Sequence, residues 1–278
     1  MDLAGRPWIL THVLGQVIIP SGYFHIFMDY YGTLDEDRDL SIDPLELILP
    51  RQLIFRSLLP HCTVLALVIN GGFTVVSAFD QSESCSLSLK MLDELFFNAP
   101  GAPTLTEAIW MSLLDAFSPS PLSHFCLEYP SPQNVTTHMW TALFGRFSDL
   151  DYVEARFSGS MPERGTVSLL ENLFAALRDP AAHRIRTLEL VFLALTSETI
   201  GAIMDLLCDR ASMGAPLERL VFVVCFCESS LDVAALKTKL ESSVNLTIWY
   251  DEDTDTAADE FRTYDTMSGP SGNAWWRV

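Results

Sequence analysis

A strand-like pattern, Leu-x-x-apolar-x-apolar, recurs along the second half of this sequence, and its period leaves few folds open. Copies begin at Leu122, Leu150, Ile185 and Leu217, and a looser copy begins at Val244. The steps between these positions are 28, 35, 32 and 27 residues, which gives about 30 residues per unit. Such a period is typical of repeats that each contribute one strand and one helix.

Helical patterns fill the intervals between these runs. Segments 135–147, 167–178, 197–210 and 231–240 carry apolar residues at the spacing of one helix face, and Asn134 is a candidate cap for the first. Strands that alternate with helices indicate parallel pairing through helical crossovers. We therefore predict an α/β fold: an irregular leucine-rich-repeat-like solenoid of alternating strands and helices with a mainly parallel, curved sheet.

The N-terminal third is less regular. The elements expected there are strands at 23–31 and 63–69, polar loops at 32–43 and 81–86, and a helix over 104–117 that opens with a capping box. No domain boundary is evident. We predict a single solenoid over residues 1–250 and an acidic, disordered tail over residues 251–278.

Charge and cysteine usage restrict the partners and the compartment. The net charge is −19, from 17 basic and 36 acidic residues, and basic residues are not clustered, so neither nucleic acid nor an acidic membrane is expected as a partner. No apolar stretch is long enough to span a bilayer. The six cysteines form no CxxC pair and several lie in apolar runs. This favours a reducing compartment, the cytoplasm or the nucleus.

Two spans carry a family resemblance. They are residues 184–227, RIRTLELVFLALTSETIGAIMDLLCDRASMGAPLERLVFVVCFC, and residues 139–159, MWTALFGRFSDLDYVEARFSG. Both resemble the C-terminal, leucine-rich-repeat-like region of F-box proteins from basidiomycete fungi, and the resemblance extends over about residues 10–252. It implies a substrate-recognition part of a ubiquitin-ligase-related protein. The F-box itself is not found in this chain, so a ubiquitin-ligase adaptor is implied as a partner only if an F-box exists outside it.

One acidic segment resembles a calcium-binding loop. Its ligand positions are Asp35, Asp37, Asp39, Ser41, Asp43 and Glu46. However, Leu40 stands where the sharp turn of such a loop requires glycine, and Pro44 interrupts its exit. We expect a solvated acidic loop here. The six histidines have no metal-ligand spacing, so we expect no metal site and no cofactor.

Motifs for catalysis are absent from the sequence. There is no GxSxG, GxxxxGK[ST] or GxGxxG motif. The expected turns after the repeat strands, at 129–132, 158–161, 193–196 and 228–230, contain one acidic residue, no histidine and no lysine. We therefore predict no catalytic residues and a protein-interaction module. The alternative is an enzyme with a scattered site in the loops at the strand ends.

Alternation within the repeat strands predicts the binding surface. Positions 4 and 6 should face the helices, so positions 3, 5 and 7 should face the open side of the sheet. Across the strands this side grades from charged to apolar residues, and we expect an exposed apolar edge. The predicted partner-binding residues are Tyr152, Glu154, Arg156, Thr187, Glu189, Val191, Arg219 and Val221.

Overall fold

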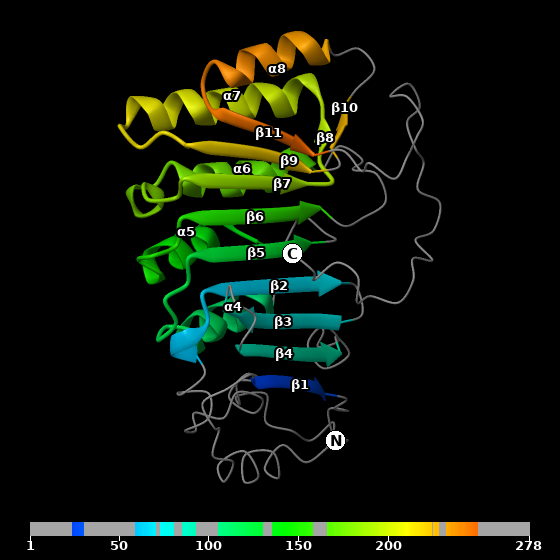
Figure 1. The fold of residues 1–278 in the computed structure, drawn as a ribbon, viewed down its shortest axis with the longest axis vertical. Coiled ribbons are helices and arrows are strands. Elements are labelled where there is room, and N and C mark those ends of the chain that lie inside the picture. The colour runs from blue at the N-terminus through cyan, green and yellow to red at the C-terminus, as the bar shows by residue number, and fades with distance from the viewer. Residues whose placement is uncertain are drawn as a thin grey trace.

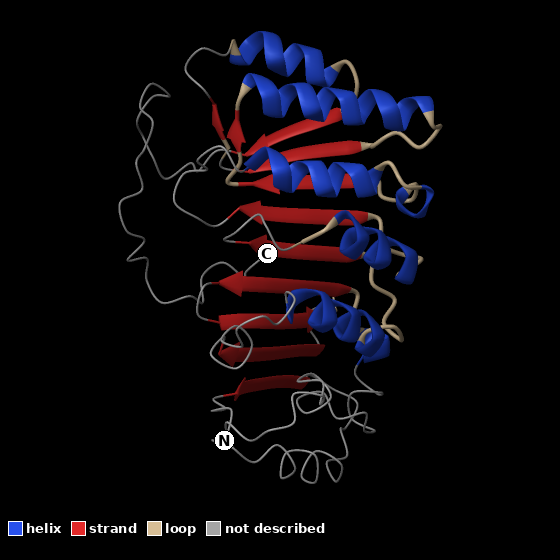
Figure 2. Cartoon of the chain, turned by 180° about the vertical axis from the view of Figure 1, so that it is seen from behind, coloured by secondary structure: helices blue, strands red, loops and turns tan. Residues whose placement is uncertain are grey.

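The chain forms one layer of strands and one layer of helices (Figures 1 and 2). The computed structural model describes residues 24–30, 59–70, 73–80, 85–92, 105–129, 135–157, 166–223, 225–227 and 232–249. In these residues, the helices all lie on the same face of the sheet. The opposite face, seen toward the viewer in Figure 1, carries no described helix, and we call it the open face.

The sheet is mixed, mainly parallel and open at both ends. Its strand order is β1-β4-β3-β2-β5-β6-β7-β9-β11, and only the β2–β3 and β3–β4 pairs are antiparallel. The strands are β1 Phe24–Tyr30, β2 Val64–Asn70, β3 Phe73–Phe79, β4 Cys85–Leu92, β5 His124–Tyr129, β6 Tyr152–Phe157, β7 Thr187–Val191, β9 Arg219–Val223 and β11 Asn245–Trp249. The predicted α/β class and mainly parallel sheet are thus confirmed.

Helices connect the parallel strands, as the alternating pattern predicts. They are α4 Leu105–Ala116, α5 Thr137–Arg146, α6 Thr166–Leu177, α7 Ser197–Ser212 and α8 Val233–Glu241, together with the short 3-10 helices η1 Leu59–His61 and η3 Pro180–Ala182. Predicted cap Asn134 lies outside the described residues. The cap observed for α5 is Thr136, whose hydroxyl accepts a hydrogen bond from the Met139 amide.

The repeat pattern places its apolar positions in the core. Positions 4 and 6 of β5, β6, β7 and β9 are buried against the helix layer, and so is position 1, which precedes each of these strands; for β7 these residues are Leu188, Leu190 and Ile185. The strands also begin at one level. The Ser123 carbonyl accepts hydrogen bonds from the amides of Asp151 and Tyr152, and the same arrangement recurs at the starts of the next strands.

The N-terminal part contains two antiparallel strand pairs that the sequence did not predict. Strands β2 and β3 form a hairpin in which Asn70 pairs with Phe73, and β4 then returns beside β3. The prediction of a loop over 81–86 is wrong at its end, because Cys85 and Ser86 begin β4. Alternating apolar and polar residues in β4 suit a strand with two different faces. Strand β1 completes this edge by pairing with β4 in parallel.

A buried arginine fixes the helix layer to the strand layer. The Arg210 side chain on α7 is fully buried and donates to the carbonyls of Leu177, Ala182 and Ile185 at 2.7, 3.0 and 2.7 Å, and to that of His183 at 3.4 Å. Burial lowers its pKa to about 10, which still leaves it charged at neutral pH. Its guanidinium thereby binds buried backbone carbonyls from the end of α6 to the start of β7, and such carbonyls need hydrogen-bond partners.

A second, two-stranded sheet lies beyond the ends of β7 and β9. Residues 193–196 were expected to form a turn, but Ala194–Leu195 forms β8 and pairs in parallel with β10, Phe226–Cys227. Phe192 joins β7 to β8 with a φ of 58°, a left-handed conformation that is uncommon for a bulky residue. Its amide donates to the Val223 carbonyl at 3.0 Å, which holds this bend against β9.

Candidate functional site

Three rows of side chains cross the open face, because the parallel strands are in register. Position 3 aligns His124, Tyr152, Thr187 and Arg219. Position 5 aligns Cys126, Glu154, Glu189 and Val221, and position 7 aligns Glu128, Arg156, Val191 and Val223. The rows are those that the repeat pattern predicts. All eight predicted partner-binding residues therefore lie on the adjacent strands β6, β7 and β9.

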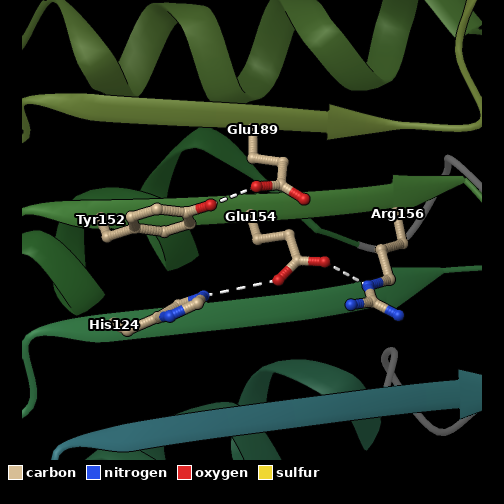
Figure 3. Close-up of polar contacts among 5 residues, drawn as sticks. All are labelled: His124, Tyr152, Glu154, Arg156 and Glu189. Carbon is tan, nitrogen blue, oxygen red and sulfur yellow. Dashed lines mark hydrogen bonds and ion pairs between the residues drawn. The ribbon is translucent and has the colours of Figure 1, made fainter. Parts of the chain in front are cut away.

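Five polar side chains meet on this face (Figure 3). His124 comes from β5, Tyr152, Glu154 and Arg156 from β6, and Glu189 from β7. We call these five residues the polar cluster. Strand alternation points them to one side of the sheet, and the register brings them within reach of one another.

Glu154 is the buried centre of the polar cluster. Its side chain accepts a hydrogen bond from Nε of Arg156 through Oε1, and its Oε2 lies 3.4 Å from Nε2 of His124. The residue is only 5% exposed. Burial by itself would raise the pKa of Glu154, but the contacts with His124 and Arg156 outweigh it and hold the pKa below its usual range. Glu154 is therefore ionised and has partners for both carboxylate oxygens.

Glu189 has a different environment although it is the register neighbour of Glu154. Tyr152 donates its hydroxyl hydrogen to Oε2 of Glu189. Burial is the main reason that the pKa of Glu189 lies above its usual range, and the charge on Glu154 adds to the effect. The pKa of Tyr152 is raised as well, by burial and by Glu189. Tyr152 thus remains a neutral hydrogen-bond donor.

Cys126 and the His124 ring complete this part of the open face. Cys126 is buried beside Glu154 in the same row, and burial together with Glu154 raises the pKa of its thiol. A thiol in such surroundings is a poor nucleophile at neutral pH. The His124 ring lies against the Tyr152 ring, with centroids 4.1 Å apart and planes tilted by 37°. These contacts order the cluster without supplying an activated nucleophile.

The predicted exposed apolar edge is not present. Val191 is 4% exposed and Val221 is 1% exposed. Both are short side chains within the sheet, flanked in their rows by Arg156 and Val223 or by Glu189 and Thr247.

The polar members of the predicted surface differ in their accessibility. Arg219 is exposed and makes no ion pair with any described residue, whereas Arg156 is committed to Glu154. Thr187 is half-buried between Tyr152 and Arg219 in its row. His124 was placed in the same row by the repeat pattern but was not among the predicted binding residues. His124 and Tyr152 occupy the same repeat position on adjacent strands, and this feature of the sequence could have identified His124 as part of the surface.

Several predictions concern residues beyond those that the structure describes. The acidic segment 35–46 and the tail 251–278 lie outside them, as do residues 130–132, 158–161 and 228–230 of the four turns in which the alternative enzyme site was placed. Within the described ranges, no group of three or more His, Cys, Asp or Glu residues could hold a metal ion. No described helix is long and apolar enough to cross a membrane.

Comparisons with known proteins assign no family. No family model matches this sequence, and no curated protein matches it significantly. The resemblance to F-box proteins rests on the two spans quoted above.

Proposed function

We propose that this chain is a non-catalytic interaction module of leucine-rich-repeat type that binds a protein partner through the open face of its sheet. The observation that carries the proposal is the polar cluster, which spans three adjacent strands on the face without described helices. Polar side chains that are ordered in advance lose little conformational freedom when a partner binds. A face of this kind suits protein recognition.

The recurring geometry supports the solenoid arrangement. One helix follows each of the strands β5, β6, β7 and β9, and the strands start at one level through repeated amide-to-carbonyl bonds. Side-chain bridges also link successive helices. The Arg146–Asp115 pair joins α5 to α4, and Arg178, directly after α6, pairs with Asp209 on α7. Each unit thus contacts its neighbours in the chain, as units of a repeat protein do.

The family resemblance extends the proposal to a substrate-recognition role in a ubiquitin-ligase-related protein, with an adaptor contact only through an F-box outside this chain. The proposed compartment is the cytoplasm or nucleus. Cys126 and Cys208 carry free thiols, which suits a reducing environment.

A matched pair of bulky substitutions tests the docking face. Thr187→Trp adds an indole to the open face without removing a bond of the polar cluster. Ala175→Trp adds the same group to an exposed position of α6, on the helix side. Proteins captured by the wild-type chain are identified and purified, and their binding to each variant is measured by calorimetry. We expect Thr187→Trp to weaken binding by at least about tenfold, or ~1.4 kcal/mol, and Ala175→Trp to leave it unchanged.

Circular dichroism provides the folding control for both variants. If Ala175→Trp weakens binding while Thr187→Trp does not, the partner docks on the helices and the proposal is wrong. Failure of the wild-type chain to bind any purified candidate would also contradict it.

A further inference from the structure

The two glutamates of the polar cluster differ in how many of their carboxylate oxygens have a partner. Both carboxylate oxygens of Glu154 have a partner, one in Arg156 and the other in His124. Glu189 uses Oε2 to accept the Tyr152 hydroxyl, and Oε1 has no hydrogen bond or ion pair with a described residue. Oε1 of Glu189 is therefore the vacant acceptor among the carboxylate oxygens of the cluster.

No cation neighbours Glu189 in its own row or strand. Its row neighbours on the open face are Glu154 and Val221, and Thr187 and Val191 flank it along β7. Arg156 donates to Glu154 instead, so Arg156 and His124 attract Glu189 only through space. A half-buried carboxylate that no cation contacts directly is incompletely compensated for its loss of hydration, and a cation at Oε1 would offset that loss.

The charge of the whole chain favours the same kind of partner. At a net charge of −19, the long-range field attracts basic molecules and repels acidic ones. The negative field of the chain and the vacant Oε1 of Glu189 are both complementary to a basic partner. Such charge complementarity raises the rate of encounter and fixes the orientation of docking.

We infer that the protein partner places an arginine or lysine side chain on Oε1 of Glu189, so that the docking segment on the open face is basic. This inference rests on the proposed function and specifies the chemistry of the same site. The cationic group donates to Oε1 while Tyr152 continues to donate to Oε2. Glu154 keeps its own partners, so Glu189 supplies the recognition charge.

The contact should depend on pH, because only the ionised carboxylate pairs with a cation. The charged or titratable groups around Glu189 are His124 on β5, Tyr152, Glu154 and Arg156 on β6, and Arg219 on β9. Burial favours the protonated form of Glu189 in the free protein. Binding must therefore release that proton at acidic pH, and affinity should fall as the pH is lowered.

The probe for this experiment is an end-blocked peptide in which arginine alternates with glycine and serine. Peptides with glutamate or glutamine in place of arginine provide comparisons. Binding is measured by fluorescence anisotropy at physiological ionic strength, where unspecific attraction is screened. The test variant is Glu189→Gln, which keeps an acceptor for Tyr152. Its charge-matched control is Glu171→Gln, at an exposed position of α6 on the helix side.

We expect Glu189→Gln to weaken binding of the arginine peptide by about fivefold to tenfold, and Glu171→Gln to change it by less than about twofold. Wild-type affinity should decline as the pH is lowered from neutral toward 4.5, the ordinary pKa of a glutamate, and that decline should disappear in Glu189→Gln. Equal weakening by both variants, or by neither, would overturn the inference, since binding would then follow only the overall charge. Tighter binding of the glutamate peptide would overturn it as well.

The same variants separate this inference from the proposed function. If Thr187→Trp abolishes binding of the protein partner while Glu189→Gln leaves it intact, the docking face is correct and the cationic contact is wrong. If Ala175→Trp is the damaging change and neither open-face variant matters, both are wrong.

Discussion

Glu154 and Glu189 are neighbouring carboxylates whose pKa values move in opposite directions from the ordinary 4.5. The lowered pKa of Glu154 means that its ionised form stabilises the fold above the unfolded-state pKa, and this contribution is lost as pH falls through the lower folded-state pKa. The raised pKa of Glu189 acts in the reverse sense. Its contribution is present below the unfolded-state pKa and is lost as pH rises through the folded-state pKa.

We therefore predict opposite effects of two isosteric substitutions on the free energy of unfolding. At neutral pH, Glu154→Gln should destabilise the protein and Glu189→Gln should stabilise it. The difference for Glu189→Gln should shrink as the pH falls toward about 4.5, because the raised pKa of Glu189 lets it become neutral above that pH. The difference for Glu154→Gln should shrink only below about 4.5, because the lowered pKa of Glu154 keeps it ionised to a more acidic pH. Urea titrations across this pH range measure the effect. Parallel pH profiles for the two variants would contradict the assignment of partners within the polar cluster.

The sequence predicted which residues share the open face but not how they pair. Alternation and repeat spacing place Tyr152, Glu154 and Arg156 on one side of their strand whatever surrounds them. Pairing depends on the neighbouring strand and on rotamers, which no spacing encodes. For this reason the burial of Glu154 and the covered position of Val191 emerged only from the structure.

At the scale of elements, the alternation of strands and helices from β5 onward was predictable because strands and helices have different apolar periods in the sequence. The hairpin formed by β2 and β3 was missed although Asn70-Gly71-Gly72 between two apolar runs is typical of a tight turn. The short strands β8 and β10 have two residues each, too few to show any alternation. They follow a bend at Phe192, whose left-handed backbone conformation no apolar spacing predicts.

Leucines at position 4 of the repeat strands should dominate the stability of these elements. Leu188 on β7 and Leu220 on β9 are fully buried in the core between sheet and helices. Replacing either by alanine should cost about 2–5 kcal/mol, from lost burial and from the cavity that remains. Arg219→Ala, at an exposed position of β9, is the control and should change stability by less than about 0.5 kcal/mol. Chemical denaturation measures all three, and a cost below about 1 kcal/mol for the leucines would refute their core position.

At the scale of the whole molecule, charge is the dominant global property. Nine strands, β1 to β7, β9 and β11, belong to one continuous sheet, and the chain carries 36 acidic against 17 basic residues, so net repulsion between like charges opposes the fold. The same excess of negative charge attracts the basic segment that we infer for the partner. The net negative charge therefore makes both stability and binding depend on ionic strength, but in opposite directions.

Added salt should therefore stabilise the fold and weaken the binding of the arginine peptide. Screening relieves self-repulsion, and each ~1 kcal/mol of relief raises the thermal midpoint by about 2–4 °C. Both effects are measured, by calorimetry and by anisotropy, in sodium chloride between about 0.02 and 0.3 M, over which the screening length falls severalfold. A midpoint that falls with sodium chloride would mean that attractive ion pairs, and not net repulsion, govern the electrostatics of the fold.

Calcium and magnesium at equal ionic strength should shift the thermal midpoint equally, because the segment 35–46 lacks the glycine of a calcium loop. A larger shift with calcium, abolished by Asp35→Ala, would show that this segment binds the ion.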